Sequence, residues 1–172
     1  KLNAQQKHFN TFNRDGLTGF DIYGRNVLVV GAGHIGKNII DIARALKANV
    51  KGVDVKQNVK DLNYVSLLDG IRWADVIVCA ALLTKETDGM LNYEVLRQAK
   101  RGCILVNVSR GEITPLQDLE KLMKEKILDG IGMDVFPDEA SVAEALRDKK
   151  KIAQDLVGSI QRLKKHDNVI FT

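Results

Sequence analysis

The stretch VLVVGAGHIGKNIIDIARALKANVKGVDV, residues 27–55, decides how this chain folds. It begins within a β-branched run, Asn26–Val30, which predicts a strand buried on both faces of a parallel sheet. Residues 34–48 then repeat apolar side chains at helical spacing and predict a helix with one apolar face (Ile35, Ile39, Ile42, Ala43 and Leu46). A second strand is predicted over residues 50–55. Strand, glycine-rich turn, helix and strand together predict a βαβ unit.

The rest of the chain continues this alternation. Strands are predicted at residues 75–80, 103–108, 128–133 and 169–171, and helices at 66–73, 92–100, 115–126 and, in a charged stretch, 138–165. Asn92 is the predicted N-cap of its helix, and Pro115 is tolerated in a first helical turn. Right-handed crossovers predict an α/β fold, a Rossmann-type doubly wound parallel sheet of about six strands in the order 3-2-1-4-5-6, between two layers of helices.

The composition fits one globular domain. A chain of 172 residues with 45% hydrophobic residues buries one core and is short for two ordinary domains. No apolar run approaches the roughly 18 residues of a membrane span, and the polar first residues do not resemble a signal peptide. Cys79 and Cys103 lie in apolar runs without metal-ligand or redox spacing and are interpreted as buried free thiols of a reducing compartment. We therefore expect a cytoplasmic protein without a bound metal.

The charge does not indicate a nucleic-acid partner. The net charge is +4, and basic clusters lie at Lys149–Lys151 and at Lys164 and Lys165. Both clusters belong to predicted helical segments that also contain Glu and Asp, so a solvated face is the favoured interpretation and a nucleic-acid surface the alternative.

Three glycines and one acid indicate the ligand. Gly31, Gly33 and Gly36 have the spacing G-x-G-x-x-G between a strand and a helix. In such a turn the first glycine permits the tight bend, the second lets the backbone approach a pyrophosphate, and the third lets helix and strand pack closely. Asp54, at the end of the next strand, would accept hydrogen bonds from ribose hydroxyls and repel a 2′-phosphate. The pattern predicts NAD, with Lys56 leaving NADP open, and the alternative is a turn whose glycines serve packing alone.

The first helical turn after the glycines would meet the phosphates. Free N–H groups near His34 and Ile35 would face the pyrophosphate, with the helix dipole behind them. His34 occupies a variable position of the motif, so it is interpreted as a loop histidine near the phosphates, with a catalytic base as the alternative.

Three further segments make the pattern more specific. ADVIVCAALLTKETDGMLN, RGCILVNVSRGEI and GIGMDVFPDE follow the glycine motif in this order. Together the four segments resemble the D-2-hydroxyacid dehydrogenases, the family of D-lactate, phosphoglycerate and formate dehydrogenases, from about Gly19 to Thr172. The resemblance implies a single dinucleotide-binding domain over residues 1–172 that uses NAD in hydride transfer to or from small 2-keto and 2-hydroxy acids.

The resemblance also implies residue roles. Arg110 in NVSRGE matches the arginine that binds the substrate, and a planar guanidinium suits the carboxylate and carbonyl of a 2-keto acid. Glu139 matches the glutamate that pairs with the catalytic histidine, although Asp138 beside it is an alternative. Asp134 matches the aspartate that contacts the nicotinamide carboxamide. Further positions match the lining of the cofactor groove: Ala81, Leu82, Thr87, Val108 and Ser109. Leu82 stands where the family commonly has proline, so we expect a freer loop there.

Two parts of the family pattern are missing from the sequence. The family's catalytic histidine follows the last strand in a motif like T-P-H, whereas this chain ends at Thr172, and none of His8, His34 and His166 occupies that position. Residues 1–18 are expected to be the tail of an interdomain connection, with the substrate domain absent. The expected activity of the chain alone is therefore NAD binding without turnover of 2-keto acids.

Other readings stay open at this point. The same family includes NAD-sensing corepressors, so a dinucleotide-sensing scaffold is an alternative to an enzyme. Another Rossmann enzyme, such as an adenosylhomocysteinase, is disfavoured because NVSRGE and MDVF occur together. Family members dimerise through this domain, so the resemblance implies a homodimer.

Overall fold

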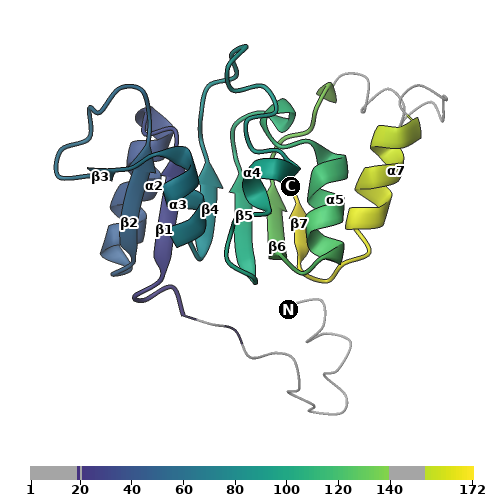
Figure 1. Ribbon diagram of the computed structural model, residues 1–172, viewed down its shortest axis with the longest axis horizontal. Helices are drawn as coiled ribbons and strands as arrows, with labels where there is room; N and C mark the ends of the chain where they lie inside the picture. Colours follow the sequence, from purple (N-terminus) through teal and green to yellow (C-terminus); the bar gives the residue numbers. More distant parts are fainter. Residues whose placement is uncertain (1–18, 20, 140–153) are drawn as a thin grey trace.

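A parallel sheet of seven strands forms the centre of the computed structural model, which describes residue 19 and residues 21–139 and 154–172 (Figure 1). The strands are β1 (Asn26–Val30), β2 (Asn49–Val53), β3 (Asn63–Tyr64), β4 (Val76–Cys79), β5 (Cys103–Asn107), β6 (Leu128–Met133) and β7 (Val169–Phe171). Their order is β3-β2-β1-β4-β5-β6-β7, and every pairing is parallel. The predicted Rossmann-type α/β fold is confirmed.

One strand was missed by the sequence patterns. β3 has two residues and pairs with β2 at the edge of the sheet, which is too short for a periodicity to detect. Because β3 takes the third place in the chain, the strand predicted at 75–80 is the fourth, and β4 lies against β1. The sheet therefore has seven strands rather than about six.

The helices are shorter than predicted. They are α2 (His34–Ala45), α3 (Leu67–Trp73), α4 (Tyr93–Leu96), α5 (Leu116–Lys124) and α7 (Gln154–Leu163), with a 3₁₀ turn η2 (Gly111–Ile113). Asn92 caps α4 as predicted, since its side chain accepts a hydrogen bond from the N–H of Val95. The helix predicted over 138–165 is described only in part, because residues 140–153 lie outside the described residues. The same holds for residues 1–18 and Lys149–Lys151.

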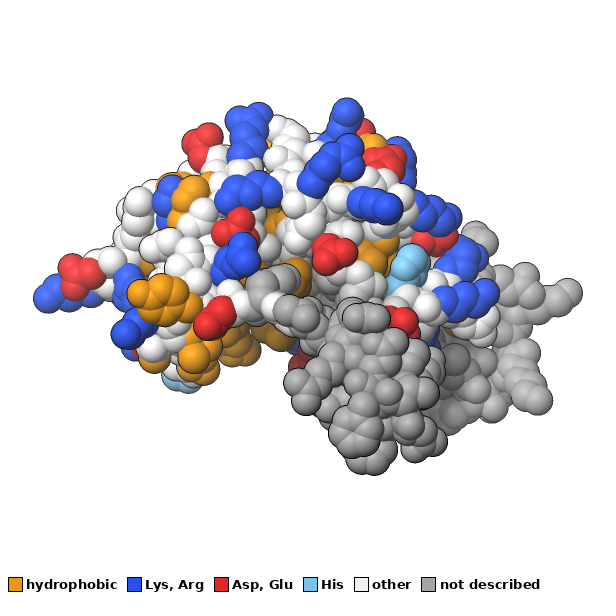
Figure 2. All heavy atoms as spheres, turned by 90° about the horizontal axis from the view of Figure 1, so that it is seen from below, with side chains coloured by type: hydrophobic (Ala, Val, Ile, Leu, Met, Phe, Trp, Pro, Cys, Tyr) orange, Lys and Arg blue, Asp and Glu red, His pale blue; other side chains and the backbone are white. Residues whose placement is uncertain are grey.

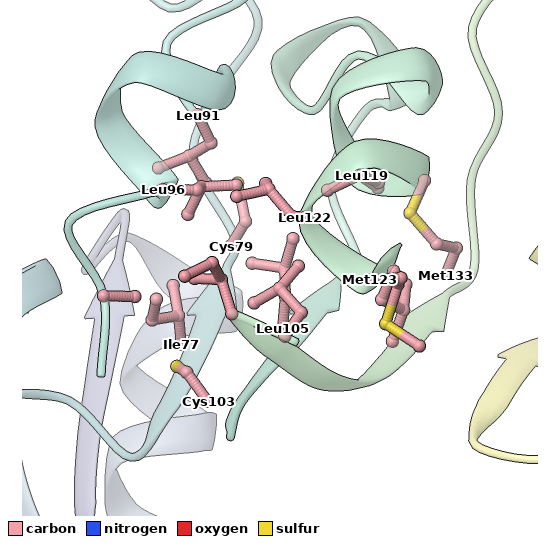
Figure 3. Packing of buried hydrophobic residues seen from close by; sticks show 14 of the residues in the cluster. Ile77, Cys79, Leu91, Leu96, Cys103, Leu105, Leu119, Leu122, Met123 and Met133 are labelled. Atoms are coloured by element: carbon pink, nitrogen blue, oxygen red, sulfur yellow. The ribbon is translucent and has the colours of Figure 1, made fainter. Parts of the chain in front are cut away.

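The core lies on both faces of the sheet. Alternate residues of a strand point to opposite faces, so Leu28 and Val30 belong to one apolar cluster while Val27 and Val29 belong to the other. The larger cluster joins the sheet to α3, α4, α5 and α7, and the smaller one joins it to α2. Figure 3 shows part of the larger cluster, with Leu105 of β5 close to Leu122 of α5.

Only part of the apolar face predicted for residues 34–48 is buried. The buried residues of this helix are Gly36, Ile40 and Ala43, whereas Ile35, Ile42 and Leu46 are each at least half exposed. The reason is local, because Gly36 is pressed against the backbone of the glycine turn and sets which side of the helix faces the sheet. We call the exposed residues Ile35, Ile42 and Leu46 the α2 stripe.

Basic side chains gather at the amino ends of the strands. In a doubly wound sheet the helices end at this edge, and the last turns of α2, α3, α5 and α7 carry Arg44, Arg72, Lys121 with Lys124, and Arg162. Cations are stabilised at helix C-termini. Figure 2, which views the molecule from below, shows Lys and Arg side chains over much of this face. The fold itself thus accounts for the basic edge.

Both cysteines are free and buried, as predicted. Burial raises the pKa of the Cys103 thiol to about 12 and also raises the pKa of Cys79, so neither thiol ionises near neutral pH. Within the described residues, no helix combines the length and the apolar character that a membrane crossing requires.

Candidate functional site

The predicted site residues meet at one edge of the sheet. All strands are parallel, so their carboxyl ends lie together. The glycine turn follows β1, Asp54 follows β2, Ala81 follows β4 and Arg110 follows β5. Ligands of open α/β sheets bind at this edge, between two neighbouring strands whose following helices lie on opposite faces of the sheet. The fold therefore brings together residues that are far apart in the chain.

The three glycines have different surroundings. Gly31 has φ +92°, and a Cβ there would lie 2.5 Å from the Cα of Ala81. A Cβ at Gly36 would lie 1.8 Å from the carbonyl oxygen of Gly31. A Cβ at Gly33 would meet no protein atom within 4 Å. Packing thus requires Gly31 and Gly36, whereas Gly33 leaves open space next to the backbone, which fits the approach of a pyrophosphate.

The first turn of α2 is open to an anion. Gly33 is the N-cap, so no side chain caps the helix, and no acidic residue lies in the first turn. His34 and Ile35 are exposed beside the turn. Unpaired N–H groups and the positive end of the helix dipole favour phosphate at such a helix start.

Asp54 is held by the backbone of two loops. Its Oδ2 accepts a hydrogen bond of 2.7 Å from the N–H of Ala32, and its Oδ1 accepts one of 2.8 Å from the N–H of Lys56. Each carboxylate oxygen has a second lone pair, so both remain able to accept from ribose hydroxyls. The bond to Ala32 also links the acid directly to the glycine turn.

Two exposed apolar side chains lie at the carboxyl edge of the sheet, on the loops that follow β2 and β4. Leu82 is 80% exposed on the loop after β4, and Val55 is 99% exposed directly after Asp54. Such exposure of apolar side chains at the ends of two strands fits contact with the flat faces of an adenine ring. Val55 was missed by the sequence patterns, because an apolar residue at the end of a strand pattern is interpreted as core.

The loop with Leu82 is held by a threonine. The Oγ1 of Thr87 accepts a hydrogen bond of 2.7 Å from the N–H of Thr84 and donates one of 2.7 Å to the carbonyl oxygen of Leu82. The expectation that leucine in place of proline leaves this loop freer stays a prediction. The hydrogen bonds of Thr87 restrain the backbone at Leu82, the position at which the family commonly has proline.

Arg110 lies on a turn that is supported by two buried polar residues, Asn107 and Ser109. Its side chain is exposed, and its Nη1 donates a hydrogen bond of 2.7 Å to the carbonyl oxygen of Ser109. The side chain of Asn107 donates to the carbonyl oxygen of Arg110 and accepts from the N–H and the hydroxyl of Ser109. The hydroxyl of Ser109 also lies 3.2 Å from the Sγ of Cys79. Asn107 was missed as a site residue, although it belongs to the quoted NVSRGE motif.

The segment with Glu139 packs against the arginine turn. A Cβ at Gly111 would lie 2.1 Å from the N atom of Pro137, so the two loops touch backbone to backbone. Glu139 is exposed, and its Oε1 accepts from the N–H of Phe136 at 3.3 Å. The N–H of Asp138 donates to Oε1 of Glu112 at 3.1 Å. Arg110 and Glu139 are thus held on adjoining loops.

Asp134 is tied to the last strand. It is exposed after β6, its N–H donates to the carbonyl oxygen of Asn107, and its Oδ1 accepts a 2.7 Å hydrogen bond from the hydroxyl of Thr172. The N–H of Thr172 in turn donates to the carbonyl oxygen of Met133. These bonds place Asp134 and the end of β7 at the same edge as Arg110.

Comparison with known proteins agrees with this geometry. A family model described as "D-isomer specific 2-hydroxyacid dehydrogenase, NAD binding domain" matches residues 1–172. Glyoxylate reductase of Thermococcus kodakarensis is 35% identical over 139 residues, covering 78% of this chain and 42% of that protein. A 2-hydroxyacid dehydrogenase homolog of Zymomonas mobilis is 31% identical over 169 residues, covering 95% of this chain and 50% of that protein.

A solved structure extends the comparison. D-lactate dehydrogenase from Aquifex aeolicus, in complex with NAD and lactic acid, superposes with a TM-score of 0.90 at 28% identity. The match covers 99% of this chain and 52% of that one. The chain thus spans about half the length of the relatives it matches.

Proposed function

Because the chain belongs to the D-isomer specific 2-hydroxyacid dehydrogenase family as its NAD binding domain, we propose that the protein it represents transfers a hydride between NAD(H) and a 2-keto or D-2-hydroxy acid. One observation carries the proposal beyond cofactor binding. Arg110 presents an exposed guanidinium at the carboxyl edge of the sheet, on a turn that packs backbone to backbone against the loop with Glu139. A domain that only held a dinucleotide would not require this arrangement.

The cofactor groove would be formed along the carboxyl edge. The N–H groups at His34 and Ile35 would bind the pyrophosphate above Gly33, and Asp54 would accept from the adenosine ribose. Leu82 and Thr87 would line the adenosine half of the groove, and Ala81, Val108 and Ser109 the part nearer the nicotinamide. Asp134 would accept a hydrogen bond from the nicotinamide carboxamide, which orients the ring.

The substrate would be bound by Arg110. Its planar guanidinium can donate two hydrogen bonds, one to the carboxylate and one to the carbonyl oxygen of a 2-keto acid. Glu139 would pair with a catalytic histidine, stabilise its protonated form and so support proton donation to the carbonyl oxygen. The bound nicotinamide would supply or accept the hydride.

A binding measurement and an activity assay test this function. We expect the 172-residue chain to bind NADH more tightly than NADPH in calorimetry, because Asp54 repels a 2′-phosphate. We expect it not to reduce glyoxylate or pyruvate by itself, since hydride transfer needs a closed cleft with the substrate at near-attack distance. Absence of saturable NADH binding would refute the cofactor role. Steady oxidation of NADH by the 172-residue chain in the presence of a keto acid would refute the expectation that it is inactive by itself.

We also infer a homodimer and a cytoplasmic location. The α2 stripe exposes three large apolar side chains, two within α2 and Leu46 at its C-cap, and Ile42 among them is 62% exposed. Apolar patches of this kind mark interaction surfaces, and a second copy of the chain is the partner we propose. The two free cysteines suit a reducing compartment.

A further inference from the structure

Asn107 is a fully buried polar residue at the carboxyl end of β5. It lies in register with Cys79 of β4 on one side and with Met133 of β6 on the other. A buried amide at the centre of an apolar sheet is costly unless all its hydrogen bonds are made. Its partners therefore show what the residue does.

Every hydrogen-bonding position of the Asn107 amide is used. Nδ2 donates to the carbonyl oxygen of Arg110 and to the hydroxyl of Thr114, both at 2.8 Å. Oδ1 accepts from the N–H of Ser109 at 2.9 Å and from its hydroxyl at 2.8 Å. The orientation of the amide is unambiguous, because a carbonyl oxygen only accepts and a backbone N–H only donates.

The backbone of Asn107 reaches the other side of the site. Its carbonyl oxygen accepts a hydrogen bond of 3.0 Å from the N–H of Asp134. One residue thus contacts both the turn that presents Arg110 and the start of the loop after β6. Thr114, its second partner, ends the short turn η2 and is also fully buried.

We propose that Asn107 is a positioning residue for substrate binding: its side-chain amide holds the Ser109–Arg110 turn so that the guanidinium of Arg110 points over the carboxyl edge. The inference rests on the proposed function for its catalytic consequence. Its structural part, that Asn107 orders Arg110, stands on the hydrogen bonds alone.

The substitution Asn107→Asp tests the structural part. Aspartate has nearly the same shape and keeps both acceptors for Ser109, but its ionised form loses both donors. In NMR spectra of the 172-residue chain, we expect the order parameter of the Arg110 Nε–H to fall below about 0.6, the range of flexible groups. Asn107→Ser, which buries no charge, should shift the same signals if the aspartate variant does not fold.

Thr114→Val is the matched control. It removes one of the two acceptors of Nδ2 without touching the bond to Arg110, so the Arg110 signals should stay close to the wild-type values. Resonances of the glycine turn, residues 31–36, should stay unchanged in all variants. Arg110 signals that remain rigid and unshifted in both Asn107 variants would overturn the proposal.

The catalytic part is measured in the complete protein. A misplacement of about 1 Å can lower a rate by about 10²-fold, so we expect Asn107→Asp to reduce kcat/KM for the keto acid by about that factor. The Kd for NADH should change less than kcat/KM, since the glycine turn and Asp54, which would bind the pyrophosphate and the adenosine ribose, make no hydrogen bond to Asn107. Equal kcat/KM values would overturn the catalytic part. A wild-type protein that reduces no 2-keto acid would instead refute the proposed function, and the NMR result would still decide the role of Asn107.

Discussion

Gly33 and Gly36 differ in what a side chain would meet, although both belong to the same motif. At Gly36 the obstacle is a backbone oxygen 1.8 Å from the new Cβ, so Gly36→Ala must displace β1 from α2. Overpacking costs about 1–3 kcal/mol, and we expect a loss of about 3 kcal/mol in the free energy of unfolding. Urea denaturation measures this loss, and a stability within about 0.5 kcal/mol of wild type would contradict it.

Gly33→Ala separates cofactor binding from folding. A Cβ there meets no protein atom, and φ is −72°, so any loss of stability comes only from the helix cap and is about 1 kcal/mol at most. The methyl group would occupy the space beside the pyrophosphate, and we expect NADH to bind at least about tenfold more weakly. Calorimetry with NADH checks this. Unchanged affinity would show that the phosphates do not approach Gly33.

At the scale of elements, one buried carboxylate joins α5 to α7. Glu120 accepts from the Nε of Arg162 through both oxygens at 2.9 Å and from the Nζ of Lys124 at 2.7 Å. The hydrogen bond from Lys124, supported by Arg162, holds the pKa of Glu120 below its ordinary value of 4.5. A lowered pKa means that the stabilisation is full above pH 4.5 and is lost as pH falls through the lowered pKa.

Glu120→Gln should therefore lower stability mainly at neutral pH. Both basic partners are about half exposed or more, so solvent screening limits the expected loss to about 1 kcal/mol. The difference from wild type should shrink towards zero in strong acid. Denaturation curves at several pH values measure it, with Glu94→Gln, in the exposed pair with Arg97, as the control that should change little. A difference that stays constant with pH would exclude the ion pair as its cause.

At the scale of the whole molecule, the proposed dimer rests on the α2 stripe. We expect Ile42→Asp to shift the chain from dimer to monomer in sedimentation equilibrium, because the charge would be buried between two copies. Asn58→Asp adds a negative charge at an exposed position outside α2 and should leave the dimer intact. A wild-type chain that remains monomeric at all concentrations would refute the dimer.

Most strands and helices of the fold were predicted from hydrophobic patterns that are clear within a single element. Val27–Val30 and Ile77 lie in apolar runs that only a doubly covered parallel sheet buries, and all the longer strands were predicted close to their bounds. The edge strand β3 and the end of α4 were not predicted, because a strand of two residues or a single helical turn is too short to show a hydrophobic period. The apolar pattern of α2 did not show which of its apolar residues are buried, since a tertiary contact, at Gly36, decides this.

The sequence by itself determined the fold class, the NAD-type glycine turn with Asp54, and the family, because these depend on spacings within short segments and on motifs in a set order. The tertiary structure alone decided which of these residues meet. Only the parallel sheet brings the ends of β1, β2, β5 and β6 to one edge. The loops of Arg110 and Glu139 are joined by the backbone contact of Gly111 with Pro137 and by the hydrogen bond from Asp138 to Glu112. The tertiary structure also gave Asn107 its place beneath Arg110, since a buried amide is recognised by its partners and not by its neighbours in the chain.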